Sequence, residues 1–187
     1  MLPHCLWRLK LLSADVGDRW HGLAEKWDRS AKGTLYAFND VHAMMTFVCD
    51  GHDETARSML NATERYADHA SDANVGMTRE IGIPFCRAAQ AFATGDYDQV
   101  VGLLLPILHR TDRHGGSHAQ RDPIAWTLLE AVLRAKRYKL ALALANERTA
   151  LEPTNPTHWK LTARALGGLG EHGDARRAYA KAEFLPI

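Results

Sequence analysis

The sequence predicts an all-α fold built from paired helices, and three observations carry this prediction. Apolar residues recur at intervals of three and four along almost the whole chain, as they do on one face of a helix. No segment shows the sustained alternation that half-buried β-strands require. The turns inside successive pairs fall at Gly51, Gly95, Lys136 and Gly170, which are 44, 41 and 34 residues apart. A helix pair that recurs at such intervals is typical of a helical solenoid.

We therefore expect a single helical-repeat domain over residues 1–187, arranged as a right-handed helical-hairpin solenoid of four to five pairs. The expected pairs cover approximately residues 3–30, 35–70, 78–111, 118–151 and 156–184. In the second pair, the first helix is apolar on two sides, so we expect it to be buried from two directions. Its partner, which follows Gly51, is apolar on one side only.

The later pairs contain prolines that affect where helices bend and begin. Pro106 lies inside an apolar run and cannot donate a hydrogen bond to the carbonyl of Gly102, which predicts a kink. The fourth pair has two candidate starts: Ser117, which could form a capping box, and Asp122, which precedes a proline. Asn155, which is also followed by a proline, is the expected start of the fifth pair.

The charge balance and the lengths of the apolar runs indicate which classes of partner the chain is expected to lack. The chain has 187 residues, of which 46% are hydrophobic, and its 23 basic and 22 acidic side chains leave a net charge of +1. This balance lacks the basic character of nucleic-acid-binding proteins, so we expect no nucleic-acid partner. No apolar run approaches the roughly 18 residues of a membrane span. We expect a cytoplasmic protein that does not associate with membranes. The three cysteines form no CxxC pattern, so neither a disulfide framework nor a zinc site is expected.

The last pair resembles a tetratricopeptide repeat. The residues at the intervals of that motif are Trp159, Ala163, Gly170, Ala175, Tyr179 and Ala182. Small residues at these positions allow two helices to approach closely, and the aromatic residues fill the space beside them.

The chain also resembles a narrower family, the tetratricopeptide repeat protein 38 family. The similar segments are residues 6–9, 15–20, 35–45, 77–80 and 115–122. Members of that family are longer, and the similarity covers only their C-terminal part, so we expect a fragment or a shortened member. The resemblance implies a helical-repeat fold and protein interaction, and it implies no established reaction or cofactor.

On this basis we expect a scaffold that binds a peptide or protein segment on its concave face. The candidate binding residues are polar and lie near the starts of the first helices of the pairs: Asn39, Asp40, His42, Arg79, Glu80, His118, Gln120, Arg121 and Asp122. Glu80 and Arg121 lie equally far before their turns, so stacked pairs would make them neighbours. An ion pair that only orients adjacent helices is the alternative reading of these two residues.

Other readings of the polar residues are weaker. His42 borders an apolar face and is interpreted as a core histidine. His114 and His118 have a spacing found in metal sites, but two glycines separate them and no acidic ligand pattern accompanies them, so no metal site is expected. The alternative function is a metal- or small-molecule-dependent enzyme fragment that uses Asp40, His42, His118 and Asp122. No nucleophile or phosphate-binding motif supports it, and we expect no enzyme activity.

The ends of the chain offer a third kind of partner, a second copy of the chain. Apolar residues are frequent between Leu6 and Leu12 and in the segment from Phe184 to Ile187. Because a solenoid needs polar end surfaces, either end could form an interface in a homo-oligomer. Charge is also uneven, since residues 35–112 carry five basic and eleven acidic side chains whereas residues 113–187 carry twelve and seven.

Overall fold

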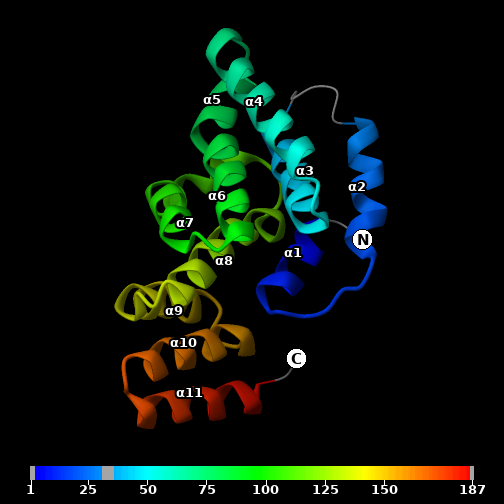
Figure 1. Cartoon of the computed structure of the whole chain (residues 1–187). Coiled ribbons are helices and arrows are strands. Elements are labelled where there is room, and N and C mark those ends of the chain that lie inside the picture. The colour runs from blue at the N-terminus through cyan, green and yellow to red at the C-terminus, as the bar shows by residue number, and fades with distance from the viewer. Residues whose placement is uncertain (1–2, 31–35, 186–187) are drawn as a thin grey trace. The chain divides into compact units, whose positions relative to one another are not determined.

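The computed structural model describes the backbone of residues 3–30 and 36–185 and the side chains of 3–27 and 36–185. All regular structure in these ranges is helical, which confirms the all-α prediction (Figure 1). The chain divides into two compact units, Met1–Leu128 and Leu129–Ile187, where the sequence predicts one domain. Leu35 and Ile187 lie outside the described residues.

The first unit contains most of the helices. Its α-helices are α1 (Pro3–Leu11), α2 (Arg19–Ser30), α3 (Ala37–Asp50), α4 (Asp53–His69), α5 (Asn74–Met77), α6 (Ile83–Thr94) and α7 (Tyr97–Leu104). A π-helix, η1 (Thr78–Gly82), precedes α6, and a 3₁₀-helix, η2 (Leu105–His114), follows α7. Helix α8 (His118–Arg134) begins in this unit, and the division falls within it.

Helix α3 is the centre of the first unit. It contacts α1, α2, α4 and α6, and every residue from 40 to 48 is buried. This burial on several sides is what the two apolar faces of its sequence predict. Trp7 of α1 is fully buried, packs against the rings of Phe85 and Phe92, and donates its indole N–H to Oγ1 of Thr127 at 2.7 Å. This buried hydrogen bond therefore joins residues near the two ends of the first unit's sequence.

The turns inside the helix pairs share one backbone conformation. Gly51, Gly95, Lys136 and Gly170 have φ angles of 74°, 82°, 58° and 84°. Glycine adopts this left-handed region without the steric cost that a Cβ atom brings, and it commonly ends helices for that reason. Lys136 adopts it as well, so glycine alone is an incomplete signal for these turns.

Two prolines change the helices that contain them. α7 ends at Leu104, and the chain continues through Pro106 as the 3₁₀-helix η2, at the place where the sequence predicts a kink. α8 begins at His118 after Ser117, whose backbone N–H donates to Oε1 of Gln120 at 2.9 Å, so the start at Asp122 is wrong. Pro123 then lies inside α8, where it lacks an N–H for the carbonyl of residue 119.

The second unit is a short series of packed helices. After the end of α8 it contains α9 (Tyr138–Leu151), α10 (Pro156–Gly168) and α11 (His172–Phe184), and α10 contacts both α9 and α11 (Figure 1). A Cβ atom at Gly168 would lie 2.3 Å from Cδ1 of Tyr138, so the absence of a side chain lets the tyrosine ring rest on the backbone of α10. Asn155 caps α10 by accepting a hydrogen bond from the N–H of Thr157 at 3.0 Å.

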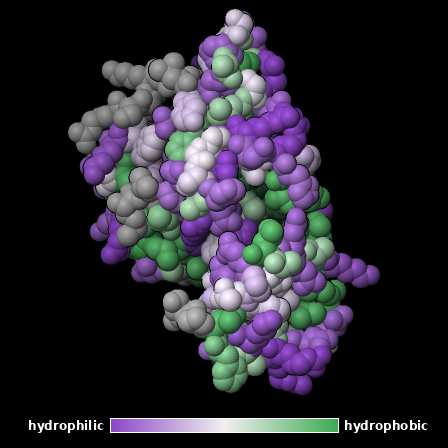
Figure 2. Space-filling view, turned by 180° about the vertical axis from the view of Figure 1, so that it is seen from behind, coloured by the Kyte–Doolittle hydropathy of each residue, from purple (hydrophilic) through white to green (hydrophobic). Residues whose placement is uncertain are grey.

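The surface mixes polar and apolar residues. On the face shown in Figure 2, apolar patches lie between hydrophilic ones. At the expected interface ends, Leu6 and Trp7 are buried, whereas Leu12 is 49% and Phe184 is 89% exposed. In the part of the chain that the structure describes, no helix has both the length and the apolar character to cross a bilayer.

Candidate functional site

A buried group of histidines lies in the first unit where α1, α3 and the end of η2 meet. Nδ1 of His42 donates to the carbonyl of Phe38 at 2.7 Å, so its Nε2 accepts from Nδ1 of His4 at 3.3 Å. Burial lowers the pKa of both rings, and Arg8 lowers that of His4 further. Both imidazoles are therefore neutral near pH 7, which fits the interpretation of His42 as a core histidine.

His114, at the end of η2, differs from these two histidines. Its side chain is fully buried, and neither ring nitrogen has a hydrogen-bond partner. Burial, together with the nearby His42 and Arg121, lowers its pKa to about 4. The ring of Phe38 lies 5.6 Å away between centroids. A neutral imidazole packed against an aromatic ring is the form that such surroundings allow.

Asp40, like His114, is a buried titratable residue with a polar atom that has no hydrogen-bond partner. It is 6% exposed, and its Oδ2 has no hydrogen-bond partner. Burial raises the pKa of this carboxyl group to about 7, because an ionised carboxylate without a partner is poorly solvated there. Asp40 therefore titrates in the physiological range.

Two of the segments that carry the family resemblance pack against each other here. A Cβ atom at Gly116 would lie 2.5 Å from Cε2 of Phe38, and one at Gly115 would lie 2.6 Å from the hydroxyl of Tyr36. Both glycines also have positive φ. Residues 115–122 and 36–45 thus meet through a contact that leaves no room for side chains on the glycines.

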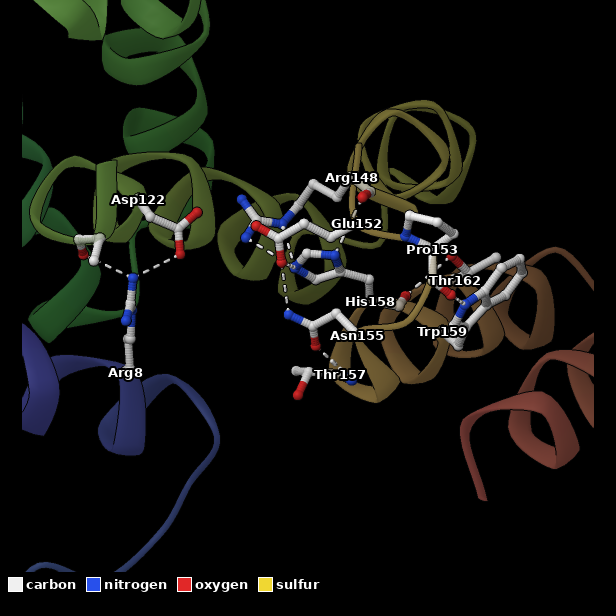
Figure 3. Close-up of polar contacts among 11 residues, drawn as sticks. Arg8, Asp122, Arg148, Glu152, Pro153, Asn155, Thr157, His158, Trp159 and Thr162 are labelled. Carbon is white, nitrogen blue, oxygen red and sulfur yellow. Dashed lines mark hydrogen bonds and ion pairs between the residues drawn. The ribbon is translucent and has the colours of Figure 1, made fainter. Parts of the chain in front are cut away.

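Arg8 connects α1 to the start of α8 (Figure 3). Its Nη2 donates to the carbonyl of Ala119 at 2.7 Å and to Oδ2 of Asp122 at 2.8 Å. The carbonyl of Ala119 is the one that Pro123 cannot satisfy, since proline has no N–H. The arginine therefore supplies the donor that the helix lacks, and Asp122 is part of a structural contact.

Several other candidate binding residues also have structural partners. Arg79 donates to the carbonyl of Ala67. The side chain of Gln120 caps the start of α8. Arg121 lies 3.4 Å from Nδ1 of His118 and donates to the carbonyl of Asp112 at 3.2 Å. Asn39 is exposed in the first turn of α3.

Glu80 forms ion pairs with two arginines of η2 that the sequence analysis did not name. Oε2 of Glu80 lies 2.5 Å from Nη2 of Arg110 and 2.9 Å from Nη1 of Arg113. The hydrogen bond from Arg113, together with both positive charges, lowers the pKa of Glu80. The physical reason is that η2, which extends α7 beyond Pro106, packs against η1 and brings its arginines to the glutamate.

Three of the four residues of the enzyme alternative have partners outside their own group. His42 bonds to Phe38 and His4, His118 contacts Arg121, and Asp122 binds Arg8. The contacts of His42 with His4 and of Asp122 with Arg8 join α1 to α3 and to α8.

A surface groove in the second unit was not identified from the sequence. It has a volume of about 540 Å³. Its lining residues come from α8, α9, α10 and α11: Leu133, Tyr138, Ala163, Arg164, Gly167, Gly168, His172, Ala175, Arg176 and Tyr179. The tetratricopeptide motif contains three of these, Ala163, Ala175 and Tyr179, which is the signal that could have indicated it. We call it the α10–α11 groove.

A second feature that sequence reasoning missed is a group of possible metal ligands, His21, Asp50 and His52. His21 is distant in sequence from Asp50 and His52, and the three residues match no metal motif, so only the structure brings them together.

Comparison with known proteins adds no assignment. No model of a known protein family matches the chain, and no solved structure matches it.

Proposed function

We propose that the chain is a helical-repeat protein-interaction scaffold and that the α10–α11 groove binds an acidic peptide segment carrying apolar side chains. One observation carries this proposal: the groove combines exposed cationic side chains with aromatic walls and a floor of small residues. Its volume of about 540 Å³ falls within the range of sites that hold small ligands or a few side chains.

The floor and walls of the groove have distinct chemistry. Gly167 and Gly168 leave the backbone of α10 open, and Ala163 and Ala175 add little bulk. Tyr179 is 44% exposed, so its ring is available to an apolar side chain of a partner. Tyrosine combines a large contact area with a polar tip, which is why it is enriched at interfaces.

The charges in the groove favour an acidic partner. Arg164 is held by Glu130 through two contacts of 2.7 and 3.0 Å, so its charge is compensated. Within the described residues, the exposed side chains of His172 and Arg176 have no polar partner. Residues 129–187 carry ten basic and six acidic side chains. A positive surface of this kind attracts and orients an acidic segment.

Hydrogen bonds also hold α9 and α10, which line this groove, in place relative to each other. His158 is buried, accepts from the guanidinium of Arg148 at Nε2, and donates from Nδ1 to the carbonyl of the same arginine at 3.2 Å (Figure 3). These bonds join the end of α9 to the start of α10. The indole N–H of Trp159 donates to the carbonyl of Pro153 at 2.8 Å and fixes the same connection. A surface on joined helices loses little freedom when a partner binds.

We propose further that the helix pairs are tetratricopeptide-like repeats of a right-handed solenoid, related to the tetratricopeptide repeat protein 38 family. Pair α10–α11 gives this the most support, because Ala163, Ala175 and Ala182 are buried where the motif places small residues. Gly170 adopts the turn conformation that joins the two helices.

Selection from a displayed library of random peptides on the full chain tests the proposal. We expect acidic peptides with aromatic or aliphatic residues to be enriched. By fluorescence anisotropy, Arg176→Glu and Tyr179→Ala should each weaken a selected peptide at least tenfold. Lys160→Glu makes the same charge change at an exposed residue outside the groove and should leave the affinity within about twofold, apart from long-range charge effects. Failure to enrich any peptide, or equal losses in all three variants, would overturn the proposal.

A further inference from the structure

Three side chains from separate helical elements present ligand atoms to one another on the first unit. His21 belongs to α2, Asp50 is the last residue of α3, and His52 immediately precedes α4. Oδ2 of Asp50 lies 3.2 Å from Nδ1 of His21 and 3.1 Å from Nε2 of His52. The three ligand atoms all lie within 4.8 Å of one another.

These separations match the edges of a small metal coordination sphere. Zinc binds imidazole nitrogen and carboxylate oxygen at about 2.0–2.1 Å, so the ligand atoms of a tetrahedral site are about 3.3 Å apart. The two separations between imidazole and carboxylate already have this length. The two imidazole nitrogens lie within 4.8 Å of each other, and the exposed ring of His21 can rotate to adjust their separation.

Local structure holds two of the ligands in place. The ring of His52 stacks on that of Phe47, with centroids 6.3 Å apart and planes 14° from parallel. The left-handed turn at Gly51 reverses the chain between Asp50 and His52. The carboxylate of Asp50 is 13% exposed and lies at the C-terminal end of α3, where the helix dipole disfavours a negative charge and favours a cation.

A fourth residue occupies the position of an outer-sphere partner. Glu25 lies one turn beyond His21 in α2, and its Oε1 is 3.7 Å from Nε2 of His21. Coordination through Nδ1 of His21 requires the ring proton to be on Nε2, which faces this carboxylate. A carboxylate that accepts from the second nitrogen of a metal-bound histidine orients the ring and strengthens the ligand.

We propose that His21, Asp50 and His52 form a binding site for a divalent transition metal ion such as Zn²⁺, with Glu25 as the outer-sphere partner of His21. Two imidazoles and one carboxylate suit zinc and neighbouring metals rather than Ca²⁺ or Mg²⁺, which prefer oxygen ligands. Three protein ligands leave a coordination position for water, and the 64% exposed side chain of His21 leaves that position open to solvent. Bound metal would join α2 to the turn between α3 and α4. This site is independent of the α10–α11 groove.

The test uses the full chain after treatment with a chelator. Isothermal titration with ZnCl₂ at pH 7.5 should show one ion per chain, and Zn²⁺ should raise the melting temperature. Co²⁺ in place of Zn²⁺ should give the visible absorption of a four-coordinate ion. Binding should weaken in acid, because protonated imidazoles cannot coordinate a metal.

Variants separate a built site from adventitious binding by surface histidines. His21→Ala and Asp50→Asn should each reduce the zinc affinity at least tenfold and abolish the thermal shift. Glu25→Gln should have a smaller effect in the same direction. His109→Ala removes an exposed histidine elsewhere in the same unit and should change neither measurement. Absence of stoichiometric binding, or equal binding by wild type and His21→Ala, would show that the three side chains only form hydrogen bonds and would overturn the proposal.

Discussion

Replacement of Asp40 by asparagine should change the stability of the first unit in a pH-dependent way. Relative to wild type, the free energy of unfolding of the variant should be higher at pH 8 than at pH 4.5. In the folded chain burial raises the pKa of this carboxyl group to about 7, whereas the pKa of an exposed aspartate is 3.8. Between these values the unfolded chain has lost the proton and the folded chain retains it. The stability that Asp40 contributes is therefore present at low pH and is lost as the pH rises towards 7. Asparagine has no such proton to lose.

The size of the effect follows from the two pKa values. Each pKa unit corresponds to about 1.4 kcal/mol, so the whole difference between folded and unfolded chains is about 4 kcal/mol. Wild type has already lost part of this stability at pH 4.5, and it should lose about 3 kcal/mol more between pH 4.5 and pH 8. The free energy of unfolding of Asp40→Asn, relative to wild type, should therefore rise by about 3 kcal/mol over this interval.

Urea denaturation followed by tryptophan fluorescence measures this change. A Trp159→Phe background restricts the signal to residues 1–128, which contain the other four tryptophans. The comparison with wild type at each pH removes the contribution of His114, whose lowered pKa acts in the opposite direction: its stability is present above pH 6.5 and is lost as the pH falls towards 4.

Asp68→Asn is the matched control, because Asp68 is exposed on α4. Its relative free energy of unfolding should stay constant with pH to within about 0.5 kcal/mol. If Asp40→Asn also gives a constant difference, the reasoning about the buried carboxyl group is wrong.

Two further substitutions test specific contacts. Thr127→Val should lower the free energy of unfolding by about 1–3 kcal/mol, since the buried indole N–H of Trp7 loses its acceptor. Trp7→Phe should then lower the free energy of unfolding less in the valine background than in the wild type. Additive losses in this double-mutant cycle would contradict the contact. Gly168→Ala should lower the melting temperature because its Cβ atom would meet the ring of Tyr138, and Tyr138→Ala should relieve this loss. Gly167→Ala, where nothing lies within 4 Å, should be neutral or stabilising, and an equal loss at both glycines would refute the close approach.

Apolar periodicity was sufficient to predict the helical class and the burial of α3. Periodicity reports which face of a helix is covered, and α3 has apolar residues on more than one face because helices surround it. The turn residues followed from the breaks in this pattern. Their positive φ angles explain why three of the four are glycine.

The candidate site was harder to predict because counting residues from a turn assumes regular helices. The π-helix η1 and the 3₁₀-helix η2, which pack together, have a different number of residues per turn, and the apolar pattern of the sequence does not indicate them. The pairing of Glu80 with Arg110 and Arg113 depends on this packing and was therefore not predicted. The role of Arg8 was also not predicted, because it depends on the carbonyl of Ala119, which Pro123 leaves without a donor.

Sequence alone could not reveal the α10–α11 groove either. Its cationic character depends on which arginines are already paired, and Arg164 is held by Glu130 whereas Arg176 points to solvent without a polar partner among the described side chains. Such a difference arises from side-chain geometry rather than from residue type.

The most direct test of the proposed function is a titration of the ¹⁵N-labelled full chain with a selected acidic peptide, followed by amide chemical shifts in NMR spectra. The account predicts that the shifts change first at residues lining the α10–α11 groove, including Tyr138, His172, Arg176 and Tyr179. Shift changes centred on the starts of η1 and α8, around Arg79 and Arg121, or spread evenly over the chain, would contradict it.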